Sequence, residues 1–112
     1  MNQGEIWLVD LEPTIGAEMN KIRPALIIND NELGRLPLKV IVPITGWKDH
    51  YNIAPWMIKI EPNEINGLSK ESSMDCFQIR SVSQERLVKK IGRIKFDEID
   101  KVQEGILKVI GI

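Results

Sequence analysis

The 112-residue sequence holds a single cysteine and a single histidine, and this scarcity excludes several kinds of site. Cys76 cannot form a disulfide within the chain, and its apolar neighbours indicate a core position rather than a nucleophile. Cys76 and His50 together cannot supply the ligands of a standard zinc site. The sequence also lacks a glycine-rich phosphate loop, a Ser-His-Asp set and a cluster of metal ligands. We therefore expect a reduced, cytoplasmic protein that needs neither a metal nor another cofactor.

Long hydrophobic runs and a large net charge are missing as well. No apolar stretch approaches the roughly 18–20 residues that cross a membrane, so we expect no membrane association. The apolar share of 43% is nevertheless enough for a packed core. The net charge is −1, but residues 1–20 carry four acidic and no basic side chains, whereas residues 80–95 carry six basic side chains against one acidic. This asymmetry suits an anionic partner on one face and equally suits a solvated pair of strands.

The chain contains no repeat, low-complexity tract or linker, so we expect a single domain over residues 1–112. Short β-rich segments bounded by turn residues predict six strands. These strands are expected at residues 5–10, 23–29, 38–44, 56–60, 75–82 and 87–94. Proline cannot donate to a sheet ladder, so Pro24 is expected at the start of its strand and Pro43 at a sheet edge or bulge. In the first strand, Ile6 and Leu8 are expected to face the core.

From Phe96 onward the apolar residues follow a helical period. One stripe of the predicted helix contains Ile99, Val102, Ile106, Val109 and Ile110. Acidic residues in the first turn suit the helix dipole, and Gly111 follows the last turn as a stop signal. The pattern predicts a mainly β fold, a small and strongly bent antiparallel sheet or half-open barrel with the helix over one end or face. Residues 31–37 are expected to form a loop, and the two longest polar loops, residues 11–22 and 45–55, are expected to carry any function.

Polar side chains at two predicted strand ends form the most informative pattern. Arg23 opens the second strand and Thr45 closes the third, so an antiparallel pairing would bring both to one rim of the sheet. A guanidinium grips phosphate oxygens and balances charge that grows in a transition state, and a hydroxyl adds a hydrogen bond, so the pair suits a phosphodiester. Trp47 and Tyr51 nearby are able to stack on unpaired bases. The alternative is that these residues have structural roles only. Arg23 would then be a surface arginine paired with Glu18, Thr45 would end a strand, and Trp47 would pack at the edge of the core.

A series of short motifs follows one order along the chain. The motifs are Gly4–Thr14, Gly16–Glu18, Arg23–Ile28, Val42–Thr45, Gln78–Val82 and Arg86–Leu87. In composition and order this series resembles the MazF/PemK toxins, and the resemblance covers most of the chain. It implies a cytosolic homodimer built on a small SH3-like barrel of about six antiparallel strands with a C-terminal helix.

The same resemblance implies an endoribonuclease that cuts single-stranded RNA, chiefly messages, at short sequences without a metal. The 2′-hydroxyl attacks the adjacent phosphate and leaves a 2′,3′-cyclic phosphate and a 5′-hydroxyl. Arg23 matches the arginine that these toxins use for proton transfer and phosphate stabilisation, and Thr45 matches the threonine that stabilises the transition state. The usual partner is a small antitoxin whose tail covers the active site. We expect RNA contacts from Lys21, Trp47, Lys48, Gln78 and Arg80.

Three positions depart from the family pattern. Many relatives carry His or Ser, then Gln, and then Asp or Glu at the positions where this chain has Ala17, Met19 and Phe77. Proton transfer by residues 17 and 77 is therefore lost. The base is then Arg23, although an arginine is a poor base, or Glu18, or a group not yet identified.

His50, the only histidine, is the other side chain with a suitable pKa range for proton transfer. We nevertheless expect Glu18 rather than His50 to matter for turnover. The family's Gly-x-Glu pattern retains Glu18, five residues before Arg23, whereas His50 lies in a polar loop suited to substrate selectivity. Glu18 would accept the proton or hold the guanidinium in place. A surface ion pair of Glu18 with Lys21 or Arg23, without a catalytic role, is the alternative.

Two rival functions share the expected fold. One is a non-enzymatic toxin similar to CcdB, the gyrase poison with this barrel, and the other is a barrel that binds RNA or a protein without cutting. Arg23 and Thr45 favour cleavage. A gyrase poison would be expected to depend on its C-terminal residues, and Val109–Ile112 shows no aromatic end. Because residues 17 and 77 are Ala and Phe, a barrel that binds without cutting is still an alternative.

Overall fold

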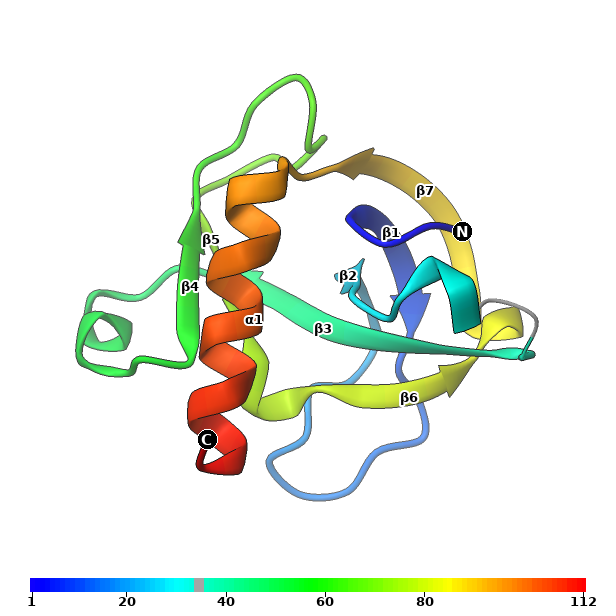
Figure 1. Ribbon diagram of the computed structural model, residues 1–112, viewed down its shortest axis with the longest axis horizontal. Coiled ribbons are helices and arrows are strands. Elements are labelled where there is room, and N and C mark those ends of the chain that lie inside the picture. Colours follow the sequence, from blue (N-terminus) through cyan, green and yellow to red (C-terminus); the bar gives the residue numbers. More distant parts are fainter. Residues whose placement is uncertain (34–35) are drawn as a thin grey trace.

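The computed structural model describes residues 1–33 and 36–112, so the predicted loop at residues 31–37 lies partly outside the described residues (Figure 1). Within these ranges, seven strands form one antiparallel sheet and one α-helix follows them. The strands are β1 (Glu5–Asp10), β2 (Ile22–Ile27), β3 (Leu38–Gly46), β4 (Met57–Ile60), β5 (Ser72–Asp75), β6 (Arg80–Ser83) and β7 (Leu87–Arg93), and the helix is α1 (Phe96–Ile110). The expectation of a mainly β fold with a C-terminal helix is confirmed.

Strand β3 is the centre of the strongly curved sheet (Figure 1). The hydrogen-bonded order is β4-β5-β3-β2-β1-β7, and β6 pairs with the first part of β3. On one side β3 pairs with β2, whereas on the other side it pairs first with β6 and then with β5. Helix α1 packs against β4 and against the short 3₁₀ turn Cys76–Gln78, so it covers one end of the sheet, as expected.

The central strands are buried on both faces, which explains the continuous apolar run in β2. Leu26 joins a core cluster that α1 completes with Ile99 and Val102. Its neighbours Ala25 and Ile27 join a second cluster on the opposite face. A strand that is covered on both faces needs apolar residues at consecutive positions rather than at alternate ones.

The predicted fifth strand, residues 75–82, contains most of β6 but only the last residue of β5, so β5 is an additional strand that raises the count from six to seven. The 3₁₀ turn Cys76–Gln78 separates β5 from β6. The Asp75 carboxylate accepts a hydrogen bond of 3.0 Å from the Phe77 N–H and so stabilises the turn. A side chain that bonds to the backbone two residues ahead competes with a sheet ladder, because it offers the N–H another partner.

Two sequence expectations about buried residues are wrong. In β1, Ile6 and Val9 are fully buried, whereas Leu8 is half-buried, because the β1–β7 register shifts on either side of the Trp7–Leu8 pair. Bulges of this kind break the strict alternation of a strand. In α1, Ile110 is 60% exposed and leaves the predicted apolar stripe.

Both prolines lie inside strands at places where a ladder is interrupted. Pro24 is the third residue of β2, and the ladder from β2 to β3 begins only at the next residue, Ala25. Pro43 lies within β3, after Ile41 has paired with β6 and before Ile44 pairs with β5. Pro43 was expected at a sheet edge or a bulge, and it lies instead in the central strand, where its missing donor falls at the point at which β3 changes neighbours. The expectation that Pro24 begins its strand is wrong, because two residues of β2 precede it. In the described ranges, no helix has the length and apolar character that a membrane crossing requires.

Candidate active site

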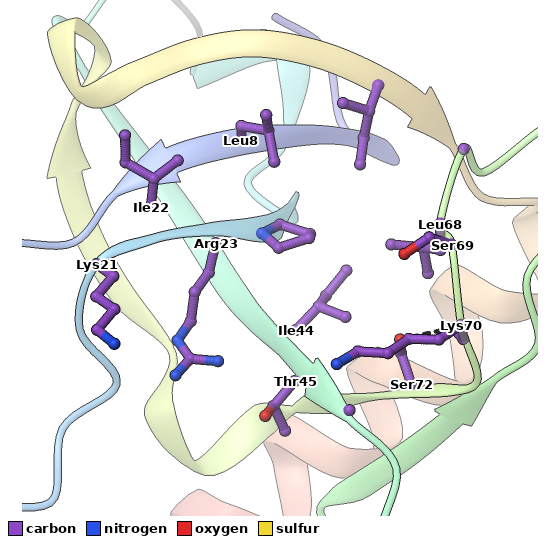
Figure 2. Close-up of a pocket in the computed structure, with 14 residues that line it drawn as sticks. Leu8, Lys21, Ile22, Arg23, Ile44, Thr45, Leu68, Ser69, Lys70 and Ser72 are labelled. Atoms are coloured by element: carbon purple, nitrogen blue, oxygen red, sulfur yellow. Dashed lines mark hydrogen bonds between the residues drawn. The ribbon is translucent and has the colours of Figure 1, made fainter.

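The first candidate is the rim where β2 begins and β3 ends. The ladder between these strands ends at the Ala25–Pro43 pair, and Arg23 and Thr45 each lie two residues beyond it, Arg23 before Ala25 and Thr45 after Pro43. The structure continues β3 through Thr45 to Gly46, so Thr45 lies in a strand rather than at the start of the predicted loop. Arg23 and Thr45 line the same pocket (Figure 2). Their predicted convergence on one rim is thus confirmed, whereas their catalytic roles stay predictions.

This pocket has a volume of about 460 Å³. We call it the cationic pocket, because its polar lining consists of the cations Lys21, Arg23 and Lys70 and the hydroxyls Thr45, Ser69 and Ser72. Residues of β1, β2, β3 and β7, together with Gly67 and Leu68, form the rest of its wall. Among the described residues that line it, none is acidic. The arrangement therefore favours an anion that carries several oxygen acceptors.

The positive charge of the cationic pocket is not neutralised inside the protein. The ion pairs between side chains of the described residues join Lys59 to Glu61 and Glu71, and Lys90 to Glu5. None of these pairs involves a cation of the pocket. A cation without a carboxylate partner keeps its full attraction for an incoming phosphate.

A hydrogen bond to the nearby backbone orients the Arg23 side chain. Its Nε donates a hydrogen bond of 2.9 Å to the carbonyl oxygen of Asn20. In the part of the chain that the structure describes, its two Nη groups have no such partner, and Figure 2 shows them directed toward Thr45. The guanidinium is thus held by one nitrogen and presents the other two for bidentate contact with phosphate oxygens.

Lys21 reaches the cationic pocket from a strained backbone. Its φ is 67°, in the left-handed region that favours glycine. Its N–H donates to a carboxylate oxygen of Glu12 at 3.0 Å, and its carbonyl accepts from the Leu11 N–H at 3.0 Å. These two bonds fix the end of the loop to the end of β1 and maintain the conformation.

Sequence reasoning missed the wall formed by Ser69, Lys70 and Ser72. The segment before β5 has no clear period, and only its Asn66-Gly67 turn could be recognised. Its position depends on the pairing of Ser72 with Gly46, and both residues lie outside the strands that the sequence predicts. The signal that was available is a lysine between two serines after a turn, and such a pattern is common on any surface.

A second pocket, of about 510 Å³, lies on the other side of the 17–23 segment. We call it the mixed pocket, because its polar lining combines Glu18, Gln78 and Arg80. Glu18 therefore does not share a pocket with Arg23 and Thr45, and its carboxylate accepts a hydrogen bond of 2.9 Å from the Ile15 N–H. The ion pair of Glu18 with Lys21 or Arg23 is absent between these described residues.

The other two polar groups of the mixed pocket bond to the same loop. The Gln78 carbonyl accepts from the Met19 N–H at 2.7 Å, and its amide donates to Asp75 at 3.2 Å. Arg80 donates to the Leu11 carbonyl at 3.4 Å. These side chains attach the loop at residues 11–22 to the start of β6 and to the turn before it.

The predicted RNA contacts Trp47 and Lys48 follow directly after the end of β3, outside the lining of the cationic pocket. Trp47 is half-buried, its ring lies 5.0 Å from Lys59 Nζ, and its edge contacts Tyr51 with ring centroids 5.8 Å apart. Lys48 is exposed. His50 lies in the 3₁₀ segment Asp49–Ile53, where it lines a separate apolar pocket and contacts Tyr51.

Cys76 is a core residue, as its neighbours predict. Burial, together with the charge of Asp75, raises the pKa of its thiol to about 12. Its thiol donates to the Val102 carbonyl at 3.6 Å, and it lies directly against Gly105 of α1. A protonated, buried thiol cannot act as a nucleophile.

Comparisons with known proteins agree with this geometry. Residues 2–110 match the model of the family described as PemK-like, MazF-like toxin of type II toxin-antitoxin system. The chain is 34% identical to Endoribonuclease MazF9 of Mycobacterium tuberculosis over 95% of this chain and 92% of that protein.

Solved structures have the same fold. MazF from Deinococcus radiodurans superposes with a TM-score of 0.82 at 20% identity, covering 100% of this chain and 97% of that one. An endoribonuclease in complex with its cognate antitoxin, from a mycobacterial species, gives 0.78 at 16% identity, covering 100% and 96%. The family match over nearly the whole chain, together with a relative above 30% identity, establishes that this chain belongs to the PemK-like, MazF-like toxins of type II toxin–antitoxin systems.

Proposed function

We propose that the protein is an endoribonuclease that cuts single-stranded RNA in the cytoplasm, acting as a single domain over residues 1–112. The observation that carries this proposal is the cationic pocket, in which Arg23 and Thr45 meet at a strand rim beside two lysines and no acidic lining residue. The relative named an endoribonuclease supports the same activity. A phosphodiester is the part of RNA that such a lining recognises.

In the proposed reaction, the 2′-hydroxyl attacks the adjacent phosphorus and the bond to the 5′-oxygen breaks. The products are a 2′,3′-cyclic phosphate and a 5′-hydroxyl. Arg23 grips two phosphate oxygens and offsets the negative charge that grows on them, and Thr45 donates a further hydrogen bond. The described lining holds neither an imidazole nor a carboxylate, so stabilisation of the phosphorane charge accounts for most of the rate. The 2′-hydroxyl proton passes to water, and the leaving 5′-oxygen takes a proton from water to become the 5′-hydroxyl. Side-chain cations supply the charge neutralisation, so the reaction is expected to need no metal.

The mixed pocket is assigned to base recognition. Glu18 offers an acceptor, Arg80 a donor, and the 60%-exposed Phe77 a stacking face. Gln78 holds the loop in position through its carbonyl, while its amide bonds to Asp75. The loop at residues 17–23 passes from one pocket to the other, so one RNA strand can place a base in the mixed pocket and a phosphate in the cationic pocket. Trp47 and Lys48 lie on the continuation of this path.

The protein is further proposed to form a homodimer and to bind an antitoxin protein. β4 and β7 end the sheet, and several large apolar side chains stay exposed on the single chain, among them Phe96, Leu107 and Ile110. A second copy would cover part of this surface. The complex of a similar fold with its antitoxin supports the second partner.

The test is incubation of the purified protein with a long, mixed-sequence RNA in excess EDTA. Discrete fragments that end in 5′-hydroxyl groups are the expected result, and the Arg23→Ala variant is the matched control. DNA supercoiling by gyrase, measured in parallel, tests the rival function. Intact RNA on diverse substrates, or cleavage that appears only after a divalent metal is added, would contradict the proposal.

A further inference from the structure

We propose that Lys70 binds the scissile phosphate from the side opposite to Arg23, so that two cations, one on strand β2 and one on the segment before β5, hold the phosphate over Thr45. This inference rests on the proposed function, because it assigns a residue of the same site. The resulting site contains three elements side by side: the start of β2, the end of β3 and the segment that enters β5. Sequence reasoning did not connect the third of these elements to the site.

Sheet pairing places the segment that carries Lys70 beside the end of β3. At the end of β3, Gly46 pairs with Ser72 and Thr45 pairs with Ser73. Lys70 precedes Ser72 by two residues, and the Ser72 hydroxyl donates a hydrogen bond of 2.9 Å to the Lys70 carbonyl. Figure 2 shows the Lys70 ammonium and the Arg23 guanidinium extending toward Thr45 from opposite sides of the pocket.

Gly46 leaves the room that the lysine side chain occupies. A β-carbon at position 46 would lie 3.2 Å from Lys70 Nζ and 3.3 Å from its Cε. The end of the lysine side chain therefore lies directly against the backbone that follows Thr45. A side chain at this position would push the end of Lys70 away by a few tenths of an ångström, so the glycine allows the ammonium its present position.

The segment that carries Lys70 is fixed at its other end by a buried corner. The Asn66 side chain is buried, accepts hydrogen bonds from the N–H groups of Asn63 and Leu68, and donates to the Glu61 carbonyl. Gly67 has a φ of +69°, and a β-carbon there would collide with the carbonyl group of Ile91. Because the corner accepts no other residue without a shift, the exposed Lys70 starts from a defined backbone position.

The charge of Lys70 remains available to a ligand. Its neighbour Glu71 pairs with Lys59 at 3.6 Å, and the Glu71 carbonyl accepts from the Trp47 N–H at 3.0 Å. Among the described residues, Lys70 takes part in none of the ion pairs. An ammonium has three donors and no acceptor, so an oxygen-rich anion such as a phosphodiester is the ligand that fits.

The first test compares Lys70→Gln with Lys70→Arg and with Lys101→Gln, which removes an exposed lysine of α1 far from the pocket lining. The cleavage rate of the long RNA is expected to fall roughly 10²-fold in Lys70→Gln, to recover in part in Lys70→Arg, and to be unchanged in Lys101→Gln. Gly46→Ala should slow cleavage in the wild-type background and have little further effect in Lys70→Gln, because both changes remove the same contact.

The second test measures binding of a 2′-O-methyl RNA oligonucleotide, which keeps the phosphates and cannot be cleaved, at several salt concentrations. Lys70→Gln should reduce the slope of log K against log salt by about 0.7, the share of one phosphate contact with a single strand. An unchanged slope overturns the proposal, whatever happens to the rate. If Lys70→Gln lowers the slope as expected but the wild-type protein cleaves no RNA, the proposed activity is refuted and the phosphate contact stands.

Discussion

The two pockets on either side of the 17–23 loop differ in what their polar groups already bond to. In the mixed pocket, Glu18, Gln78 and Arg80 each bond to the backbone of the loop at residues 11–22. In the cationic pocket, the terminal groups of Arg23 and Lys70 have no carboxylate partner among the described residues. Groups that bond internally hold a structure in place, whereas groups that stay available can stabilise a transition state without first breaking a bond. The comparison assigns chemistry to the cationic pocket and recognition to the mixed pocket.

The largest effect is expected from Arg23→Ala, which removes the bidentate donor of the cationic pocket. The cleavage rate should fall by at least roughly 10²–10³-fold, with a smaller change in RNA affinity, because the contact strengthens mainly in the transition state. Single-turnover kinetics and a binding titration separate the two quantities. Should the variant cut within about threefold of wild type, the assignment of chemistry to this pocket is wrong.

Thr45→Ala tests the hydroxyl between the two cations. Loss of one neutral hydrogen bond of about 1 kcal/mol predicts a decrease of roughly tenfold in rate. Thr45→Ser keeps the hydroxyl and is the matched control. Equal rates for the alanine and serine variants would show that the hydroxyl makes no contact with the reacting phosphate.

Glu18→Gln sharpens the contrast between the pockets. Because Glu18 bonds to Ile15 in the mixed pocket, we expect a decrease of only a few fold, which depends on the RNA sequence and appears mainly in KM. His50→Ala, in the separate apolar pocket, should cleave like wild type. A dead His50→Ala protein beside a fully active Glu18→Gln protein on the same RNA would reverse both assignments.

Part of this site follows from the sequence alone. Arg23 and Thr45 could be placed together because each lies at the end of a clear strand, and antiparallel neighbours bring such ends to one rim. Glu18 was placed too near Arg23, because five residues of loop can reach far from a strand. Here Gly16, with a φ of +60°, and the Ile15–Glu18 bond turn the loop toward β6.

Lys70 and the seventh strand could not be predicted, for a physical reason that they share. Residues 72–75 are buried and mostly polar, so they show no strand period, and the Asp75 side chain bonds to Phe77 where a continuous strand was expected. The position of Lys70 depends on the register between β5 and β3, which is set by tertiary pairing. The periodicity of residues 72–75 contains no information about the strand with which they pair.

Lys21→Gly separates stability from function at the edge of the cationic pocket. A non-glycine residue at φ 67° is strained, so glycine should raise the free energy of unfolding by about 1 kcal/mol. The same change removes one cation of the pocket and should weaken RNA binding. Denaturant unfolding and the binding titration measure the two effects, and a destabilised Lys21→Gly protein would contradict the strain.

The smallest expected effect concerns the turn beneath the mixed pocket. Burial raises the pKa of Asp75 above its usual 3.8, although the hydrogen bonds from Phe77 and Gln78 oppose the shift. A raised pKa in the folded state means that Asp75 contributes stability below pH 3.8 and loses this contribution as the pH rises through the folded value. The stability of Asp75→Asn relative to wild type should therefore increase from pH 3 to pH 7. Thermal melts at several pH values would show the opposite trend if the carboxylate were stabilised by its partners.

The central claim is that a metal-free cationic pocket transfers the phosphate of RNA to its own 2′-hydroxyl. The most direct measurement is the chemistry of the new ends after wild-type and Arg23→Ala proteins have been incubated with one long RNA in excess EDTA. Wild type should give fragments whose 5′ ends accept label from a polynucleotide kinase without prior phosphatase treatment and whose 3′ ends carry a cyclic phosphate, and Arg23→Ala should give none. Fragments with 5′-phosphate ends, or the same cuts at an equal rate from the variant, would contradict the account.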